Sequence, residues 1–197
     1  LDGGKMLVGP GSAVVFNYRP WRIGGQHQII VRAGGELSVV GSSSEPALFT
    51  VARDTLYGRF QSLLPVVPTV YHLDAPALFA SPTSSIRSSD RWKGIRFEAG
   101  SRGTLTHTIF RYGTHTIFEL PIFGSVSVWD SERFGSLIQI ASDDVSVVSS
   151  TFAYVRGGAV IEVNDASPLI FDNRILPFPF VENNYRSNKE HNFRMMG

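Results

Sequence analysis

Apolar and polar residues alternate along this chain in runs of only a few positions, which is the pattern of short β-strands. Three of these runs read alike, each with two apolar residues around one polar residue, at 95–97, 138–140 and 161–163. We expect the apolar members of the three runs to stack on one another in the interior: Ile95, Phe97, Ile138, Ile140, Ile161 and Val163.

A second strand follows each run at the same distance. Eight positions separate the last apolar residue of the run from the first apolar residue of the next strand (97 to 105, 140 to 148, 163 to 171). Three polar residues then separate two apolar ones in each copy (105 and 109, 148 and 152, 171 and 175), and the last two copies are offset by 171 − 148 = 23 residues. A repeat of this length with such short strands predicts a solenoid, in which each coil buries its neighbour's inner face.

The fold class expected is therefore all-β, a right-handed parallel β-helix formed by residues 1–181 as one domain. The N-terminal part carries compatible apolar stretches at 14–16, 29–41 and 46–50. Two long insertions interrupt the coils, at about 53–91, with Pro65, Pro68, Pro76 and Pro82, and at about 114–135. Residues 182–197 have no clear periodicity and are expected to be a polar C-terminal tail.

Composition excludes several classes of function and site but identifies none. The net charge of +1 gives no electrostatic footprint for nucleic acid, and no apolar run approaches the roughly 20 residues of a membrane helix. The chain has no cysteine, which excludes disulfides, thiolate metal sites and cysteine nucleophiles. It begins at Leu1, so we expect either a removed leader or a piece of a longer chain.

Several of these stretches together resemble a known family. Pro10-Gly11 precedes the strand at 14–16; Ala33-Gly34-Gly35 lies within 31–41; and Arg91-Trp92-Lys93-Gly94 precedes the run at 95–97. The sequence over about 6–52 and 91–176 is similar to right-handed parallel β-helix repeat proteins of the pectate-lyase-like superfamily, closest to the non-enzymatic extracellular type. The resemblance implies an extracellular or cell-surface location. The superfamily also contains lyases and epimerases, so fold alone does not decide function.

Lyases and epimerases of this kind need acidic residues that hold Ca²⁺ or neutralise a uronate, and a base that abstracts a proton. The candidate catalytic residues are the pair Asp143 and Asp144, then Asp165 and Asp172 on neighbouring coils, with Arg174 or Arg156 as the positive charge. The competing interpretation is that acidic residues between strands are solvated turn formers. Ca²⁺ is the one cofactor that the catalytic interpretation implies.

Other catalytic signatures are missing from the sequence. His107 and His115 lie close together, but no HxxxH-type spacing points to a metal site. Serine is abundant, yet no G-x-S-x-G nucleophile elbow occurs.

Aromatic residues in or beside the insertions are the candidate binding residues. They form a platform for sugar rings or a partner protein, or else they fold their own segments against the solenoid. The two interpretations are compatible, and the residues concerned are Trp21, Tyr57, Tyr71, Phe118, Phe123 and Trp129.

The sequence thus favours a secreted or cell-surface module for adhesion, scaffolding or matrix assembly, without catalysis. Its expected partners are proteins or further copies, which would associate through the solenoid ends or the loops, and glycans; neither nucleic acid nor membrane insertion is expected. The rival hypothesis is a polysaccharide lyase, hydrolase or epimerase acting along one face of the coils. A third is a glycan-binding module without turnover.

Overall fold

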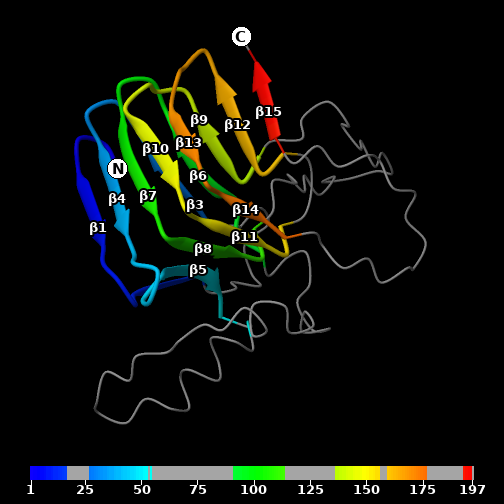
Figure 1. Cartoon of the computed structure of the whole chain (residues 1–197). Coiled ribbons are helices and arrows are strands. Elements are labelled where there is room, and N and C mark those ends of the chain that lie inside the picture. Colours follow the sequence, from blue (N-terminus) through cyan, green and yellow to red (C-terminus); the bar gives the residue numbers. More distant parts are fainter. Residues whose placement is uncertain are drawn as a thin grey trace, which may run out of the picture.

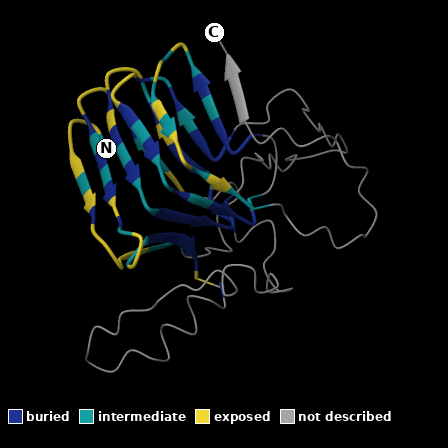
Figure 2. Ribbon diagram, in the orientation of Figure 1, coloured by how far each residue is buried: buried dark blue, intermediate teal, exposed yellow. Residues whose placement is uncertain are grey.

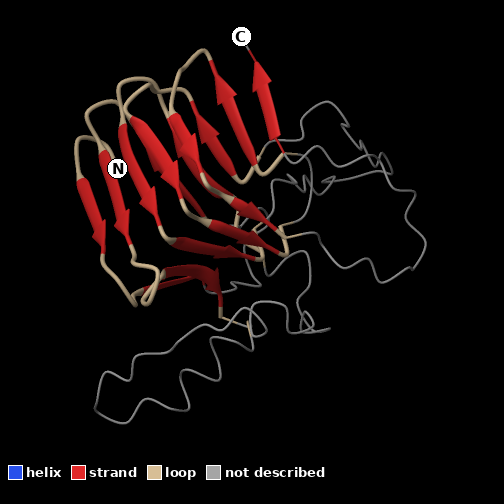
Figure 3. Ribbon diagram, in the orientation of Figure 1, coloured by secondary structure: helices blue, strands red, loops and turns tan. Residues whose placement is uncertain are grey.

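The computed structural model describes residues 1–16, 27–52, 54, 91–113, 136–155 and 159–176, and the backbone of one further strand at 193–196. Every regular element of this described part is a β-strand, and the strands form parallel sheets (Figures 1 and 3). No helix in the described part is long and apolar enough to cross a membrane.

The described strands form three five-stranded sheets. Sheet A contains β1 (Lys5–Val8), β4 (Glu36–Val40), β7 (Arg102–Thr106), β10 (Val145–Val148) and β13 (Leu169–Phe171). Sheet B contains β2 (Ala13–Phe16), β5 (Ala47–Val51), β8 (Thr108–Arg111), β11 (Thr151–Ala153) and β14 (Arg174–Ile175). Sheet C contains β3 (Gln28–Val31), β6 (Gly94–Phe97), β9 (Ile138–Ile140), β12 (Ile161–Asn164) and β15 (Phe193–Met196).

The chain visits the three sheets in the order A, B, C and then returns to A, so each strand pairs in parallel with the strand three places later. One passage through the three sheets is called a coil below. Successive coils lie side by side, as Figure 1 shows. The arrangement is all-β and parallel, and it is compatible with the β-solenoid expected from the sequence.

The expected inner columns of sheet C are confirmed. Ile95, Ile138 and Ile161 are register partners on consecutive strands, and all three are buried. The neighbouring column is equally buried and consists of Phe97, Ile140 and Val163. Each such side chain contributes about 1.5–3 kcal/mol when it leaves water, so these columns hold adjacent coils together (Figure 2).

The alignment of the repeats was predicted correctly for one pair of coils and wrongly for the other. Val148 pairs with Phe171, as the 23-residue offset predicts. Leu105, however, pairs with Val147 rather than Val148, so the first copy is displaced by one residue. Register shows the cause: Phe97 and Thr104 are seven positions apart, whereas the equivalent Ile140 and Ser146 are six apart. Gly100 lies within the seven-position interval with a φ of 75°, a conformation that glycine adopts without strain.

An aromatic column fills the inner side of sheet B. Phe110 lies between Phe49, at a centroid distance of 5.3 Å, and Phe152, at 5.0 Å. Trp92 packs beside this column, 5.9 Å from Phe49, and its indole Nε1 donates to the carbonyl of Arg111. Trp92 is fully buried.

The end of the chain differs from the expected polar tail. Strand β15 lies within residues 182–197 and pairs with β12 along its whole length, from Ile161↔Phe193 to Asn164↔Met196. These four residues therefore extend sheet C, and the periodicity was missed because the strand is short and isolated in the sequence.

Candidate functional site

The connections at the three corners between the sheets differ greatly in length. Connections from sheet C to sheet A are four residues long (32–35, 98–101, 141–144 and 165–168), and those from A to B are six or fewer. Connections from sheet B to sheet C are longer in every coil: 17–27, 52–93, 112–137, 154–160 and 176–192. Both expected insertions thus begin and end at one corner of the coils, which we call the B–C corner. Stacking places the strand ends that these connections join along one edge.

A buried ion pair lies at this corner. Asp54 sits just beyond β5, where its backbone N–H donates to the carbonyl of Val51. Arg111, the last residue of β8, donates from Nε to Oδ2 of Asp54 at 2.8 Å and from Nη2 to Oδ1 at 3.1 Å. The Thr50 hydroxyl donates to the same Oδ2 at 2.6 Å. The arginine and aspartate side chains are 2% and 0% exposed, so the bidentate geometry compensates two charges held away from water.

Two stacked tyrosines extend this pair toward the next coil. Tyr112 and Tyr154 lie 5.1 Å apart at an interplanar angle of 11°, and the guanidinium of Arg111 lies over both rings. Arg91 also contacts this pair of rings, donating from Nη1 to the carbonyls of Tyr154 at 2.6 Å and Gly113 at 3.3 Å. Burial raises the pKa of Tyr154 above its ordinary value of 10.0, and the positive charge of Arg111 partly offsets this.

The cluster joins the described starts and ends of successive connections. Asp54 and Arg91 flank the segment 55–90, Tyr112 precedes the segment 114–135, and Tyr154 is the first residue of the next connection. The Asp54–Arg111 pair and the hydrogen bonds donated by Arg91 hold these positions through buried contacts. This cluster was not predicted from the sequence. The available signal was a tyrosine at the same place in two copies of the repeat, two positions after Phe110 and after Phe152.

The candidate catalytic aspartates are divided between two other corners. Asp143 and Asp165 lie in successive turns between sheets C and A, and Asp143 accepts a hydrogen bond from the backbone N–H of Ser167 at 2.6 Å. Asp144 points instead across the outer face of sheet A, where its carboxylate lies 3.9 Å from Nε of Arg102. The structure thus brings Asp143 and Asp165 to one corner and gives Asp144 a different neighbour.

Asp172 and Arg174 lie at the corner between sheets A and B. The carboxylate of Asp172 accepts a hydrogen bond from the hydroxyl of Ser149 at 2.9 Å. Asp172 and Asp165 have φ values of 53° and 48°, which aspartate tolerates in turns. Among the described residues, no three histidine, aspartate or glutamate side chains come close enough together to hold a metal ion. The five candidates therefore do not form one constellation.

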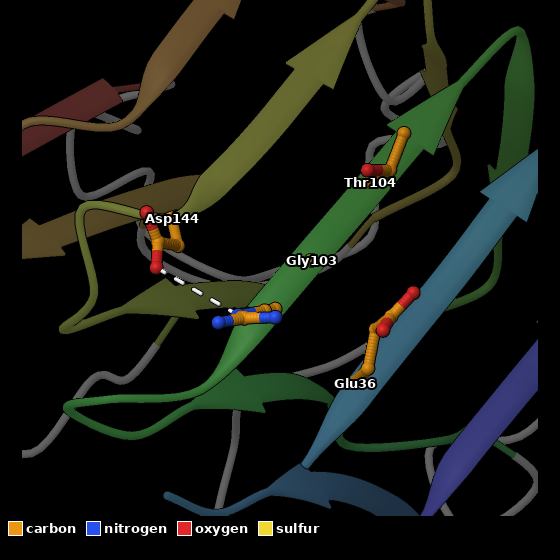
Figure 4. Close-up of a pocket in the computed structure, with 5 residues that line it drawn as sticks. Glu36, Gly103, Thr104 and Asp144 are labelled. Carbon is orange, nitrogen blue, oxygen red and sulfur yellow. Dashed lines mark ion pairs between the residues drawn. The ribbon is translucent and has the colours of Figure 1, made fainter. Parts of the chain in front are cut away.

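A shallow depression of about 460 Å³ lies on the outer face of sheet A (Figure 4). It is lined by Glu36, Arg102, Gly103, Thr104 and Asp144, which come from three adjacent coils. Arg102 and Asp144 are 70% and 73% exposed, so water screens their interaction. The depression offers two carboxylates, a guanidinium and a hydroxyl to solvent, and it contains only one of the candidate aspartates.

The candidate binding residues lie outside the described part of the chain. Arg156 does as well, and the aromatic residues concerned are Trp21, Tyr57, Tyr71, Phe118, Phe123 and Trp129. Their platform and packing interpretations both remain predictions.

Comparison with protein-family models, with curated proteins and with solved structures finds no match for this chain.

Proposed function

We propose that this chain is a non-catalytic scaffold of an extracellular or cell-surface protein, which binds a partner or a polymer through the segments at the B–C corner. The observation that carries the proposal is the distribution of connection lengths. Three sheets of short strands keep two corners tight, while every longer connection begins and ends at the third. Binding residues are commonly carried by loops on a rigid scaffold, and this corner is where the chain devotes most residues to connections.

The proposal extends to the fold and its setting. We place the three sheets in a right-handed parallel β-helix, because parallel crossovers within a sheet are nearly always right-handed. The resemblance of 6–52 and 91–176 to extracellular β-helix repeat proteins supports the location outside the cell or at its surface. Proteins, glycans or further copies of the chain are the partners proposed.

The buried cluster of Asp54, Arg111, Tyr112 and Tyr154 gives the corner a rigid base. Loops that bind with useful affinity lose less entropy when their ends are held in place. Since Asp54 and Arg91 stand on either side of 55–90, the cluster sets where that segment leaves and rejoins the sheets.

Binding and turnover can be separated in one experiment. The full chain is applied to immobilised polygalacturonate, alginate, chitin, cellulose and collagen, and both retention and released fragments are measured. We expect retention on at least one polymer without fragments. Failure to bind any of them would contradict the adhesion proposal in this form.

The alternative function is a lyase, hydrolase or epimerase that acts on uronate polymers. It is favoured by one observation, the depression on sheet A that exposes Asp144 beside Arg102. Release of unsaturated uronate products by the full chain, lost in Asp144→Asn but kept in the matched variant Asp172→Asn at the other corner, would establish this alternative. We expect no such product from the unmodified chain.

A further inference from the structure

The outer face of sheet A is unlike the other faces of the described part. The large apolar side chains that are strongly exposed in the described part all belong to sheet A. They are Leu7, Val40, Leu169 and Phe171, which are 68%, 45%, 60% and 66% exposed. On sheet B, by contrast, the outward-facing Leu48 and Ile109 are buried and pack against Leu176. The exposed apolar side chains of sheet A form two groups on this face, one on β1 and β4 and one on β13, with β7 and β10 between them. An exposed apolar face is a candidate interaction surface.

The outward-facing residues of sheet A form three columns that cross the strands. The first column carries alternating charges, the second is mostly hydroxyl-bearing in its middle, and the third is apolar or threonine. In strand order from β1, they are Lys5, Glu36, Arg102 and Asp144; Leu7, Ser38, Thr104, Ser146 and Leu169; and Val40, Thr106, Val148 and Phe171.

A column in which positive and negative side chains alternate can pair with the same column of a second copy that runs in the opposite order. If a second copy is turned by a two-fold axis parallel to the strands and midway between β7 and β10, β7 faces the second copy's β10 and β4 faces its β13. Arg102 then lies opposite Asp144 of the second copy, and Asp144 opposite Arg102. An axis through β7 itself would instead oppose Arg102 to Arg102 and Glu36 to Asp144, which is repulsive.

The same axis brings the apolar residues of the two copies together. Val40 faces Phe171 of the second copy, Thr106 faces Val148, and Ser38 faces Leu169. One symmetry operation thus opposes Arg102 to Asp144 twice and covers three of the four exposed apolar side chains. Glu36 keeps its partner Lys5 within the same chain, 2.7 Å away, and Leu7 and Lys5, on β1, lie outside the contact. From this agreement we infer that sheet A is the interface of a two-fold symmetric homodimer, with the two sheets packed face to face and their strands aligned.

The size of the face sets the strength of the dimer. Four strands span about 19 Å across the sheet and five residues about 17 Å along it. The projected area of the two faces together is therefore about 650 Å², below the roughly 1,000 Å² of a specific interface and in the range of weak contacts. The dimer is therefore weak, with a dissociation constant above about 1 µM, and high concentration at a surface favours it.

Sedimentation velocity over roughly 10 µM to 1 mM tests the interface, and five variants locate it. Arg102→Glu and Phe171→Asp weaken dimerisation at least tenfold. The charge swap Arg102→Glu with Asp144→Arg restores it. Lys5→Glu and Leu7→Asp, on the same face but outside the contact, leave it unchanged. Far-UV circular dichroism confirms that each variant is folded, since all these positions are on the surface. A chain that stays monomeric over this range, or a dimer indifferent to Arg102 and Phe171, would overturn the inference.

Crosslinking separates this geometry from stacking at the coil ends. The chain has no cysteine, so Val40→Cys/Phe171→Cys carries only the two introduced thiols. A short bis-maleimide that spans the roughly 10 Å between packed sheets links the double variant into closed dimers only. Leu7→Cys/Leu169→Cys is the control, because Leu7 and Leu169 share a column at opposite edges of sheet A and become neighbours if copies stack end to end. A ladder of multimers from the control would refute the two-fold arrangement.

Discussion

Two of the arginine–aspartate pairs in the described part lie in opposite environments, Arg111–Asp54 in the interior and Arg102–Asp144 at the surface. Removing the carboxylate of each tests how the B–C corner is held. Asp54→Ala leaves the guanidinium of Arg111, 2% exposed, without its carboxylate and also removes the acceptor of the Thr50 hydroxyl. Breaking a buried pair in this way costs about 3–5 kcal/mol. Asp144→Ala removes the partner of Arg102 in a pair that is 3.9 Å long and mostly exposed, where about 0–1 kcal/mol is expected.

The free energy of unfolding of each variant is measured by urea denaturation, followed by tryptophan fluorescence and circular dichroism. A double-mutant cycle adds Arg111→Met and the double variant Asp54→Ala/Arg111→Met. We expect the double variant to recover most of the stability lost in Asp54→Ala, because an apolar pair carries no uncompensated charge. Equal losses in Asp54→Ala and Asp144→Ala, or a double variant no more stable than Asp54→Ala, would refute the idea that the buried pair organises the corner.

Three further predictions concern the interior. Phe110→Ala opens a cavity between Phe49 and Phe152 and is expected to lower the free energy of unfolding by about 3–5 kcal/mol. The control Phe171→Ala removes an exposed side chain and changes that free energy by less than about 0.5 kcal/mol. Similar losses for the two variants in urea titrations would be inconsistent with the aromatic column. Gly103→Ala places a Cβ 2.3 Å from the Phe97 ring and costs about 1–3 kcal/mol, while Gly9→Ala, with nothing within 4 Å, is neutral or slightly stabilising; thermal unfolding distinguishes them. The pKa of Tyr154 is raised in the folded state, so its contribution to stability is complete below pH 10.0 and is lost as the pH rises above that value. Tyr154→Phe should therefore reduce the loss of stability at alkaline pH. An unchanged dependence of stability on pH would contradict the cause assigned to the shift.

The inner columns could be predicted because they depend on the local period of two. Ile95 and Phe97 alternate with Arg96, and the same pattern at 138–140 and 161–163 placed three strands in one sheet. The register of sheet A could not be predicted from spacing alone. One additional residue before Thr104 changes no apolar position in the sequence pattern, yet it moves Val148 from the expected partner Leu105 to Thr106.

The corner cluster shows a different limit. Asp54 and Arg111 are 57 positions apart, and nothing local in the sequence connects a lone aspartate to the last residue of a distant strand. Their contact follows from β5 and β8 being neighbours in sheet B. The candidate aspartates illustrate the same point in reverse: Asp143 and Asp144 are adjacent in sequence, but one binds a turn N–H while the other lies beside Arg102 on the face of sheet A.

The most direct test of the scaffold proposal is to compare the binding of the full chain with that of a chain in which 55–90 and 114–135 are replaced by flexible Gly-Ser linkers of about ten residues, with Asp54, Arg91 and Tyr112 kept. Both chains are applied to the five immobilised polymers. We expect the shortened chain to unfold cooperatively in urea, as the full chain does, and to lose retention on every polymer that the full chain binds. A folded, shortened chain that is still fully retained would place binding on the sheets and contradict the scaffold proposal.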